Sequence, residues 1–275
     1  MRTTLKCIAI MGMAMLLTPI NLFAQEAAPA RPEYITVTTM YWNMDYENFD
    51  MQEWIAVEKE FMDKVTRKNE FVTNASFYMH RFTPDNRELI YVQTYPNWEA
   101  IDKATARGNE LAELAWPDKT ARDAFFDKQA AYYDNYHSDE IYATMSGAKV
   151  MTAPPGDDMI LYVRKSHFAF PKDGTQKEFG ELRDEFTKNV LHKNQYIHGY
   201  YPNVHAWGSD RTEFVEAFML KTMGDFPNMF NRTEELVKAH WPDATARDAM
   251  NKKMGSYFTG VHGDYIYTLV EELMK

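Results

Sequence analysis

The chain has 275 residues, with 40 acidic and 30 basic side chains and a formal net charge of −10 at neutral pH. This acidity argues against nucleic acid and anionic membrane surfaces as partners, because both are negatively charged. The only cysteine is Cys7, so the chain has no internal disulfide.

The first 24 residues have the pattern of a secretory signal peptide. Arg2 and Lys6 lead into an apolar run over residues 7–23, and Ala24 supplies a small residue at a suitable cleavage point. A membrane anchor is the alternative, but a run of about 17 residues is short for a bilayer span. We therefore expect a secreted or periplasmic protein with no membrane association after cleavage. Its mature chain would carry a net charge of −12 and begin with a flexible lead-in over residues 25–33.

In chain order, the next elements form the same series twice: strand, helix, strand, strand, helix, strand. Runs of β-branched and aromatic residues predict the strands, and apolar residues at helical spacing predict the helices. The predicted strands cover residues 34–43, 75–82, 88–94 and 141–145 in the first half, and residues 159–168, 200–207, 213–219 and 266–270 in the second.

The two halves are an internal repeat. The stretch Trp116–Ala124 returns as Trp241–Ala249, 125 positions later, and 15 of the 35 positions from Leu111 to Met145 are identical without a gap. A repeat of this kind indicates two copies of one domain. We place the copies at residues 34–146 and 159–275, joined by a linker over residues 147–158.

The best-preserved stretch, Trp-Pro-Asp-x-Thr-Ala-Arg-Asp, is interpreted as structural. Its proline ends one helical segment, and Thr120 with Asp123 fits a capping box for the next segment. Arg122 lies in the first turn of that segment, where we expect a carboxylate partner. The second copy repeats the pattern with Thr245, Asp248 and Arg247.

Each half has the element order of a ferredoxin-like unit, an open four-stranded sheet with helices on one face. The duplicated β-α-β-β-α-β order resembles the dimeric α+β-barrel superfamily in a fused, single-chain form. The resemblance implies an α+β fold in which two antiparallel sheets pack face to face, with a site between them. Because the repeat pair replaces a dimer, a monomer would suffice. The superfamily includes cofactor-free monooxygenases, isomerase-like enzymes and haem enzymes such as chlorite dismutases, so the resemblance implies no single reaction.

Strand alternation predicts which side chains line the space between the sheets. We place Ile90, Val92, Val215 and Ala217 under the helices, and Met40, Trp42 and Lys165 inside. The interior candidates for catalysis are His80, His205 and Glu216. The candidates for ligand binding are Tyr78, Tyr91, Tyr142, His167, Asn203, Trp207 and Tyr267.

A structural role competes with a functional one at several of these positions. His80 and His205 are equivalent in the repeat, as are Tyr142 and Tyr267, so both pairs could belong to the scaffold. His167 and Glu216 lack an identical counterpart, which favours function. His137 with Asp139, and their counterparts His262 and Asp264, are placed in turns before the last strands, where two ligands are too few for a structural metal.

These observations favour an exported protein that binds a small apolar or aromatic molecule between its sheets. It could act on that molecule as a cofactor-independent oxygenase or isomerase-like enzyme, with a barrel histidine as base. A haem protein with such a histidine as axial ligand is the alternative, and a non-catalytic binding module is the third hypothesis. The sequence requires no cofactor and does not decide whether the protein is an enzyme. A packed core between the sheets would exclude a ligand there.

Overall fold

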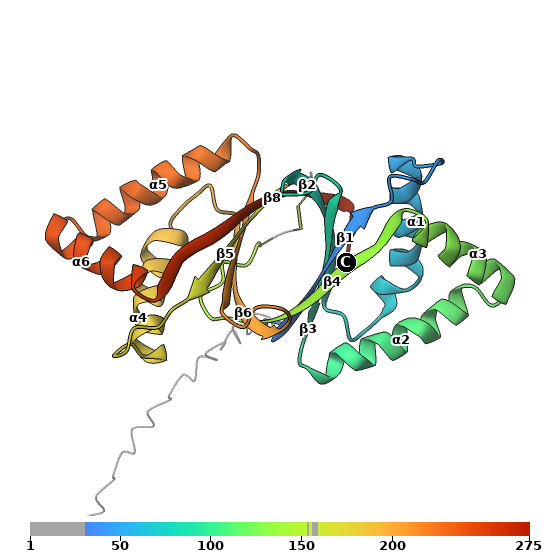
Figure 1. Ribbon diagram of the computed structural model, residues 1–275, viewed down its shortest axis with the longest axis horizontal. Coiled ribbons are helices and arrows are strands. Elements are labelled where there is room, and N and C mark those ends of the chain that lie inside the picture. Colours follow the sequence, from blue (N-terminus) through green and yellow to red (C-terminus); the bar gives the residue numbers. More distant parts are fainter. Residues whose placement is uncertain (1–30, 153, 156–158) are drawn as a thin grey trace, which may run out of the picture. The chain divides into compact units, whose positions relative to one another are not determined.

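The computed structural model describes residues 31–152, 154–155 and 159–275, and Figure 1 shows their arrangement. The predicted signal peptide, most of the lead-in and part of the linker lie outside these residues.

Eight antiparallel strands form one closed barrel in the order β1-β3-β2-β8-β5-β7-β6-β4. Each repeat supplies four neighbouring strands with its last strand at one edge, which is the order of a ferredoxin-like sheet. The edges of the two sheets are then joined through β2 with β8 and β4 with β6. The predicted α+β barrel is confirmed, and closure leaves no sheet edge exposed. The strands are β1 (Tyr34–Trp42), β2 (Asn74–Phe82), β3 (Glu88–Tyr95), β4 (Tyr133–Thr144), β5 (Ile160–Phe168), β6 (Gly199–Trp207), β7 (Glu213–Leu220) and β8 (Phe258–Met274).

The helices cover the outside of the barrel in two groups, one from each repeat (Figure 1). Those of the first repeat are α1 (Met51–Lys64), α2 (Glu99–Ala115) and α3 (Lys119–Ala130), with a short turn η1 (Thr66–Lys68). Those of the second are α4 (Gln176–Phe186), α5 (Asp225–His240) and α6 (Ala244–Gly255), with a π-helical turn η2 (Thr187–Leu191) after α4. None of the helices in the described part of the chain is long and apolar enough to cross a membrane.

The sheet packs against apolar residues on both of its faces. One apolar cluster, which includes Leu161 and Leu269, fills the inside of the barrel. Two further clusters lie under the helices, one around Trp54 in the first repeat and one around Leu220 in the second. Because apolar residues cover both faces, apolarity alone does not show which way a strand residue points.

The repeated Trp-Pro-Asp stretch is structural, but its cap lies two residues earlier than predicted. Asp118 and Asp243 are the N-caps of α3 and α6, and each side chain accepts a hydrogen bond of 2.8 Å from the backbone N–H three residues on. Thr120 lies inside the helix. Arg122 donates to the Trp116 carbonyl at 2.9 Å rather than to a carboxylate, and Arg247 does the same to Trp241. Each arginine thus ties the new helix to the end of the preceding one.

The last strand of each repeat is longer than predicted. Strand β4 begins at Tyr133 and β8 at Phe258, so His137 and His262 lie within strands rather than in turns. Their neighbours Asp139 and Asp264 bond across the sheet, to Thr38 at 2.7 Å and to Arg164 at 3.0 Å. The residues before the predicted starts are mostly polar and exposed, so the apolar alternation that marks a strand is missing there.

The segment at the end of each repeat donates hydrogen bonds to the other repeat. Lys275 donates to the carbonyls of Thr66 and Asn69 in the first repeat. Lys149, which follows β4, donates in the same way to the Asn194 carbonyl of the second repeat at 2.9 Å. Asn194 and Asn69 are equivalent residues, so the exchange of end segments is reciprocal.

Candidate functional site

The space between the two sheets is a packed core. Tyr142 donates a hydrogen bond of 2.7 Å to Glu213, and Tyr267 donates one of 2.5 Å to Glu88. These buried pairs lie in equivalent places, and each joins the last strand of one repeat to the third strand of the other. The place of the predicted ligand, between the sheets, stays a prediction. Tyr142 and Tyr267 do face the interior, as we predicted.

The barrel histidines line neither of the two cavities described below. The Nδ1 atom of His80 lies 2.8 Å from the Thr83 hydroxyl, and that of His167 lies 3.0 Å from a carboxylate oxygen of Asp210. His205 is half-buried and lies opposite Tyr142 in the pairing of β6 with β4. The structure thus gives His80 and His167 local partners at strand ends.

The remaining interior candidates have mixed surroundings. Tyr78 packs against the apolar cluster inside the barrel, and burial raises its pKa to about 12. Asn203 is buried and donates to the Tyr201 carbonyl at 2.9 Å. Trp207 is 67% exposed, so it does not line an enclosed space. Lys165 lies close to Glu140 and Tyr142, at 3.2 and 3.3 Å.

The third strand of each repeat has its faces exchanged relative to the prediction. Ile90, Val92, Val215 and Ala217 belong to the cluster inside the barrel. Tyr91 and Glu216 consequently lie on the other face, under the helices. Tyr91 stacks on Phe77 with ring centroids 4.4 Å apart. The prediction failed because both faces of these strands are apolar.

The prediction aligned the first strand of one repeat with that of the other one residue out of register. Trp42 lies opposite Tyr133 and Phe168 lies opposite Phe258, so equivalent residues of β1 and β5 are 126 positions apart. The prediction used the 125-residue offset that holds for the rest of the repeat. In β1 and β5 that offset compares a residue on one face of the sheet with a residue on the other face. Met40 and Trp42 therefore pack under the helices, against the cluster around Trp54, and not inside the barrel.

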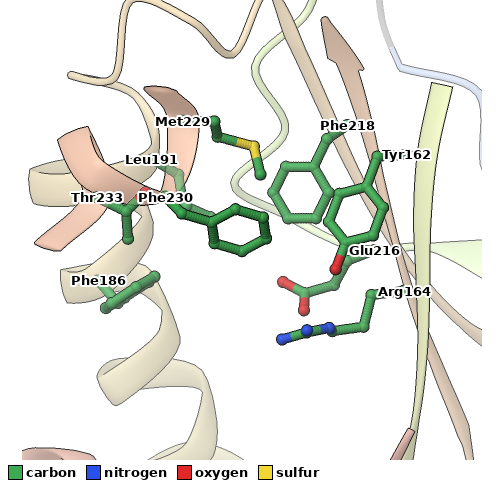
Figure 2. A pocket seen from close by; sticks show the side chains of 9 residues that line it. All are labelled: Tyr162, Arg164, Phe186, Leu191, Glu216, Phe218, Met229, Phe230 and Thr233. Carbon is green, nitrogen blue, oxygen red and sulfur yellow. The ribbon is translucent and has the colours of Figure 1, made fainter. Parts of the chain in front are cut away.

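Two cavities lie in the second repeat, between its sheet and its helices. The smaller has a volume of about 240 Å³ and lies between β5 and β7 on one side and α5 and η2 on the other. Figure 2 shows the side chains of Arg164 and Glu216 projecting from the sheet toward the helices, with Phe230 and Leu191 opposite. Arg164 is already bonded to Asp264.

The larger cavity has a volume of about 340 Å³ and lies against α4 and α6. This size falls within the range usual for small-molecule sites, as does the mixture of an apolar lining with a few polar groups. Its polar lining comes from Arg183, Thr187, Tyr200, Glu216 and Asn251. Its apolar lining consists of Phe179, Phe186, Phe214, Phe258, Met250 and Met254.

Glu216 belongs to the walls of both cavities. It accepts a hydrogen bond of 2.7 Å from the Tyr200 hydroxyl. Burial raises the pKa of Glu216, and this hydrogen bond and the charges of Arg164 and Arg183 oppose the rise only in part. Burial and the neighbouring carboxyl also hold the pKa of Tyr200 well above its usual value. In this low-dielectric environment the protonated form of each group is favoured more than it would be in water.

Arg183 is the least satisfied polar group of the larger cavity. It is 5% exposed, and its Nη2 atom donates to the carbonyl and the hydroxyl of Ser146. Its Nε and Nη1 atoms are buried without a hydrogen-bond partner among the described residues, and so is the hydroxyl of Thr187. We did not select Arg183, Thr187 or Tyr200 from the sequence.

The same place in the first repeat holds a hydrogen-bonded polar network. Glu58, the counterpart of Arg183, accepts hydrogen bonds from Tyr133 at 2.6 Å and Gln129 at 2.9 Å. The Tyr133 hydroxyl also accepts one from Trp54 at 2.8 Å. Tyr91 replaces Glu216, as its stacking on Phe77 shows. One repeat thus has a closed polar network, and the other has cavities and unpaired donors.

Haem does not fit these cavities. Neither histidine nor cysteine occurs among the residues that line them. The two tyrosines that could supply a phenolate are Tyr162 and Tyr200, and both donate to carboxyl groups. In the described part of the chain, no group of three or more His, Cys, Asp or Glu side chains could hold a metal ion.

Comparison with known proteins identifies the fold. No protein-family model and no curated protein matches the chain. A proposed monooxygenase from Fusobacterium nucleatum subsp. nucleatum superposes with a TM-score of 0.55 at 11% identity, over 87% of this chain and 92% of its own. A second, from Lactobacillus acidophilus, has a TM-score of 0.53 at 10% identity, over 88% and 95%.

A chlorite dismutase variant from Candidatus Nitrospira defluvii superposes equally well. Its TM-score is 0.53 at 12% identity, over 89% of this chain and 94% of its own. At such low identity these likenesses concern the fold alone. Together with the closed eight-stranded barrel, they show that this protein has the fold of the dimeric α+β-barrel superfamily, with both halves in one chain.

Proposed function

We propose that the protein binds a small, largely aromatic molecule in the larger cavity of the second repeat. The observation that carries this proposal is the difference between the repeats. In the first repeat the corresponding side chains Glu58, Gln129 and Tyr133 bond to one another. The second repeat has Arg183, Glu216 and Thr187 in the wall of a cavity of about 340 Å³. Phe179, Phe214 and Phe258 form an aromatic wall with ring centroids 5.6 to 6.0 Å apart.

Glu216 is the group that could act on a bound molecule. Its raised pKa keeps the proton on the carboxyl closer to neutral pH than for an ordinary glutamate. A group of this kind can exchange a proton with a substrate, as an isomerase-like enzyme or a cofactor-independent oxygenase requires. The relatives by fold include two proposed monooxygenases, which is in line with such chemistry. A binding protein without catalysis is the second candidate, and it would use the same cavity.

Binding in the cavity can be tested by introducing the residue that the first repeat has at the equivalent position. Thr187 corresponds to the fully buried Met62, so Thr187→Met places a long apolar side chain against the cavity. The probe is 2-naphthamide, an uncharged two-ring aromatic, and its dissociation constant is measured by fluorescence titration. We expect the wild-type protein to bind it and Thr187→Met to weaken binding at least tenfold, because the added side chain occupies the site.

Lys188→Met is the matched control. It introduces the same side chain at the next position, which is exposed, and should leave the affinity unchanged. If the wild-type protein does not bind 2-naphthamide, or if both variants bind it equally well, the cavity is not a site for aromatic molecules. Catalysis is tested separately. Glu216→Gln should abolish turnover of any substrate found for the protein while leaving a dissociation constant of the same order.

We further propose that the protein is exported and works as a monomer. The pattern of residues 1–24 supports export, and the fused repeats supply the second sheet that a dimer would otherwise provide. The mature protein recovered from its native source should begin at Gln25, as N-terminal sequencing would show. Its mass by light scattering should equal that of one chain. An uncleaved N-terminus would contradict export, and a doubled mass would contradict the monomer.

A further inference from the structure

Three hydrogen-bond donors at the larger cavity have no acceptor. They are Nε and Nη1 of Arg183 and the hydroxyl of Thr187, and both residues line the cavity. Five buried side-chain atoms in the described residues lack a partner, so three of the five gather at this one place. Buried donors without partners cost free energy, and a bound group that accepts hydrogen bonds would remove that cost.

The charges around Arg183 favour an anion. Asp184 lies 3.4 Å from its Nη2 atom, but that carboxylate is 62% exposed and its interaction is screened by water. The other nearby carboxyl, Glu216, is already bonded to Tyr200. The Glu216 carboxyl is not a hydrogen-bond partner of Nε or Nη1 of Arg183. The guanidinium of Arg183 is thus buried with no carboxylate among the described residues bonded to its Nε or Nη1 atom.

At the equivalent place in the first repeat, the buried polar side chains have hydrogen-bond partners. There, the buried charge-bearing side chain is Glu58, and Tyr133 and Gln129 supply its two donors from the same chain. In the second repeat the sign is reversed. Arg183 supplies donors, and the positions of Tyr133 and Gln129 hold Phe258 and Met254, which offer no oxygen acceptor.

We propose that the larger cavity is specific for an aromatic carboxylate, whose carboxylate group accepts hydrogen bonds from Arg183 and Thr187 while its ring packs against Phe179, Phe214 and Phe258. This inference rests on the proposed function and names the class of its ligand. The bond between a guanidinium and a carboxylate is charge-assisted, and it is among the stronger hydrogen bonds in proteins. Burial of Arg183 strengthens it further.

The experiment compares 2-naphthoate with 2-naphthamide, which has the same rings and an uncharged head. Both dissociation constants are measured at neutral pH by fluorescence titration of the wild-type protein. We expect 2-naphthoate to bind roughly ten- to a hundredfold more tightly, the range for a hydrogen bond to a charged group. Arg183→Met should remove this preference and leave the affinity for 2-naphthamide within about threefold.

Two further variants keep the test decisive. Thr187→Val preserves the shape of the side chain and removes its hydroxyl, so it should reduce the preference several-fold even if Arg183→Met does not fold. Arg232→Met is the control. Arg232 also has a buried Nε atom without a partner, but it lines neither cavity, and its removal should leave the preference intact.

The outcomes separate this inference from the proposed function. Equal binding of the two probes by the wild-type protein, or a preference that survives in Thr187→Val and Arg183→Met, would overturn the carboxylate but not the aromatic site. Failure of both probes to bind would overturn both. Loss of the preference in Arg232→Met would show that net charge, and not the cavity, attracts the carboxylate.

Discussion

Glu58 is a buried acid whose protonation is coupled to folding. It is 2% exposed, and burial raises its pKa to about 7, although the hydrogen bonds from Tyr133 and Gln129 oppose the rise. In the unfolded chain the same carboxyl ionises near 4.5. Between these two pH values the folded protein keeps a proton that the unfolded chain releases. The stabilisation is thus complete below pH 4.5 and is lost as the pH rises through 7.

Glu58→Gln should remove this dependence. The difference in unfolding free energy between wild type and variant should shift in favour of the variant by about 3 kcal/mol as the pH rises from 4 to 8. Urea denaturation at several pH values measures it. Glu60→Gln removes an exposed carboxyl of the same helix. Its unfolding free energy should change with pH as that of the wild type does. If the unfolding free energies of wild type and Glu58→Gln change equally with pH, Glu58 is ionised in the folded protein.

At the scale of single residues, the sequence identified Glu216 but not its surroundings. It was selected because its counterpart is Tyr91, and that asymmetry is visible without a structure. The same comparison along the first helix pairs Arg183 with Glu58, a reversal of charge within an apolar stripe, and it could have identified Arg183. The location could not be found this way. The alternation of β7 fits both faces, because Val215 and Phe214 are both buried.

At the scale of elements, the repeated stretch gives a direct test of helix capping. Asp118 and Asp243 accept the backbone N–H bonds that begin α3 and α6. Replacing either aspartate by alanine should cost about 1 kcal/mol of unfolding free energy. Thr120→Ala and Thr245→Ala are the controls, since both threonines are exposed within their helices, and they should cost much less. A larger loss for the threonines, measured by thermal denaturation, would restore the capping box that the sequence suggested.

The order and type of the elements could be predicted from the sequence, whereas registers and strand lengths could not. The element series, the two helical regions of each repeat and the closed fold agree with the prediction. The face of β1 was wrong because the loop after it differs in length by one residue between the repeats, and one residue exchanges the faces of a strand. The first half of β8 was missed because its pairing with β5 holds mostly polar residues extended, and polar residues carry no apolar alternation.

At the scale of the molecule, β8 connects the repeats and makes their stabilities interdependent. It pairs with β5 of its own repeat and then with β2 of the first, as Figure 1 shows by the long path of this strand. Val270 and Leu273, near its end, belong to the core of the first repeat around Trp54. The first repeat therefore depends on residues at the far end of the sequence.

Leu273→Ala should consequently destabilise the first repeat. Leu273 is fully buried, and loss of its side chain should cost about 2 to 5 kcal/mol of unfolding free energy. Hydrogen exchange should show the largest loss of protection in α1, more than 200 residues away in sequence. Glu272→Ala changes an exposed neighbour and should have little effect. Loss of protection confined to the second repeat would contradict this interdependence.

The reciprocal end segments also set the order in which the chain can fold during synthesis. The first repeat leaves the ribosome early, but its core lacks Val270 and Leu273 until translation is almost complete. The edge of β2 has no partner until β8 arrives. A fragment that ends at residue 146 should accordingly show no cooperative unfolding transition. Until the final strand emerges, the first repeat thus lacks part of its core and one of the two strands that pair with β2.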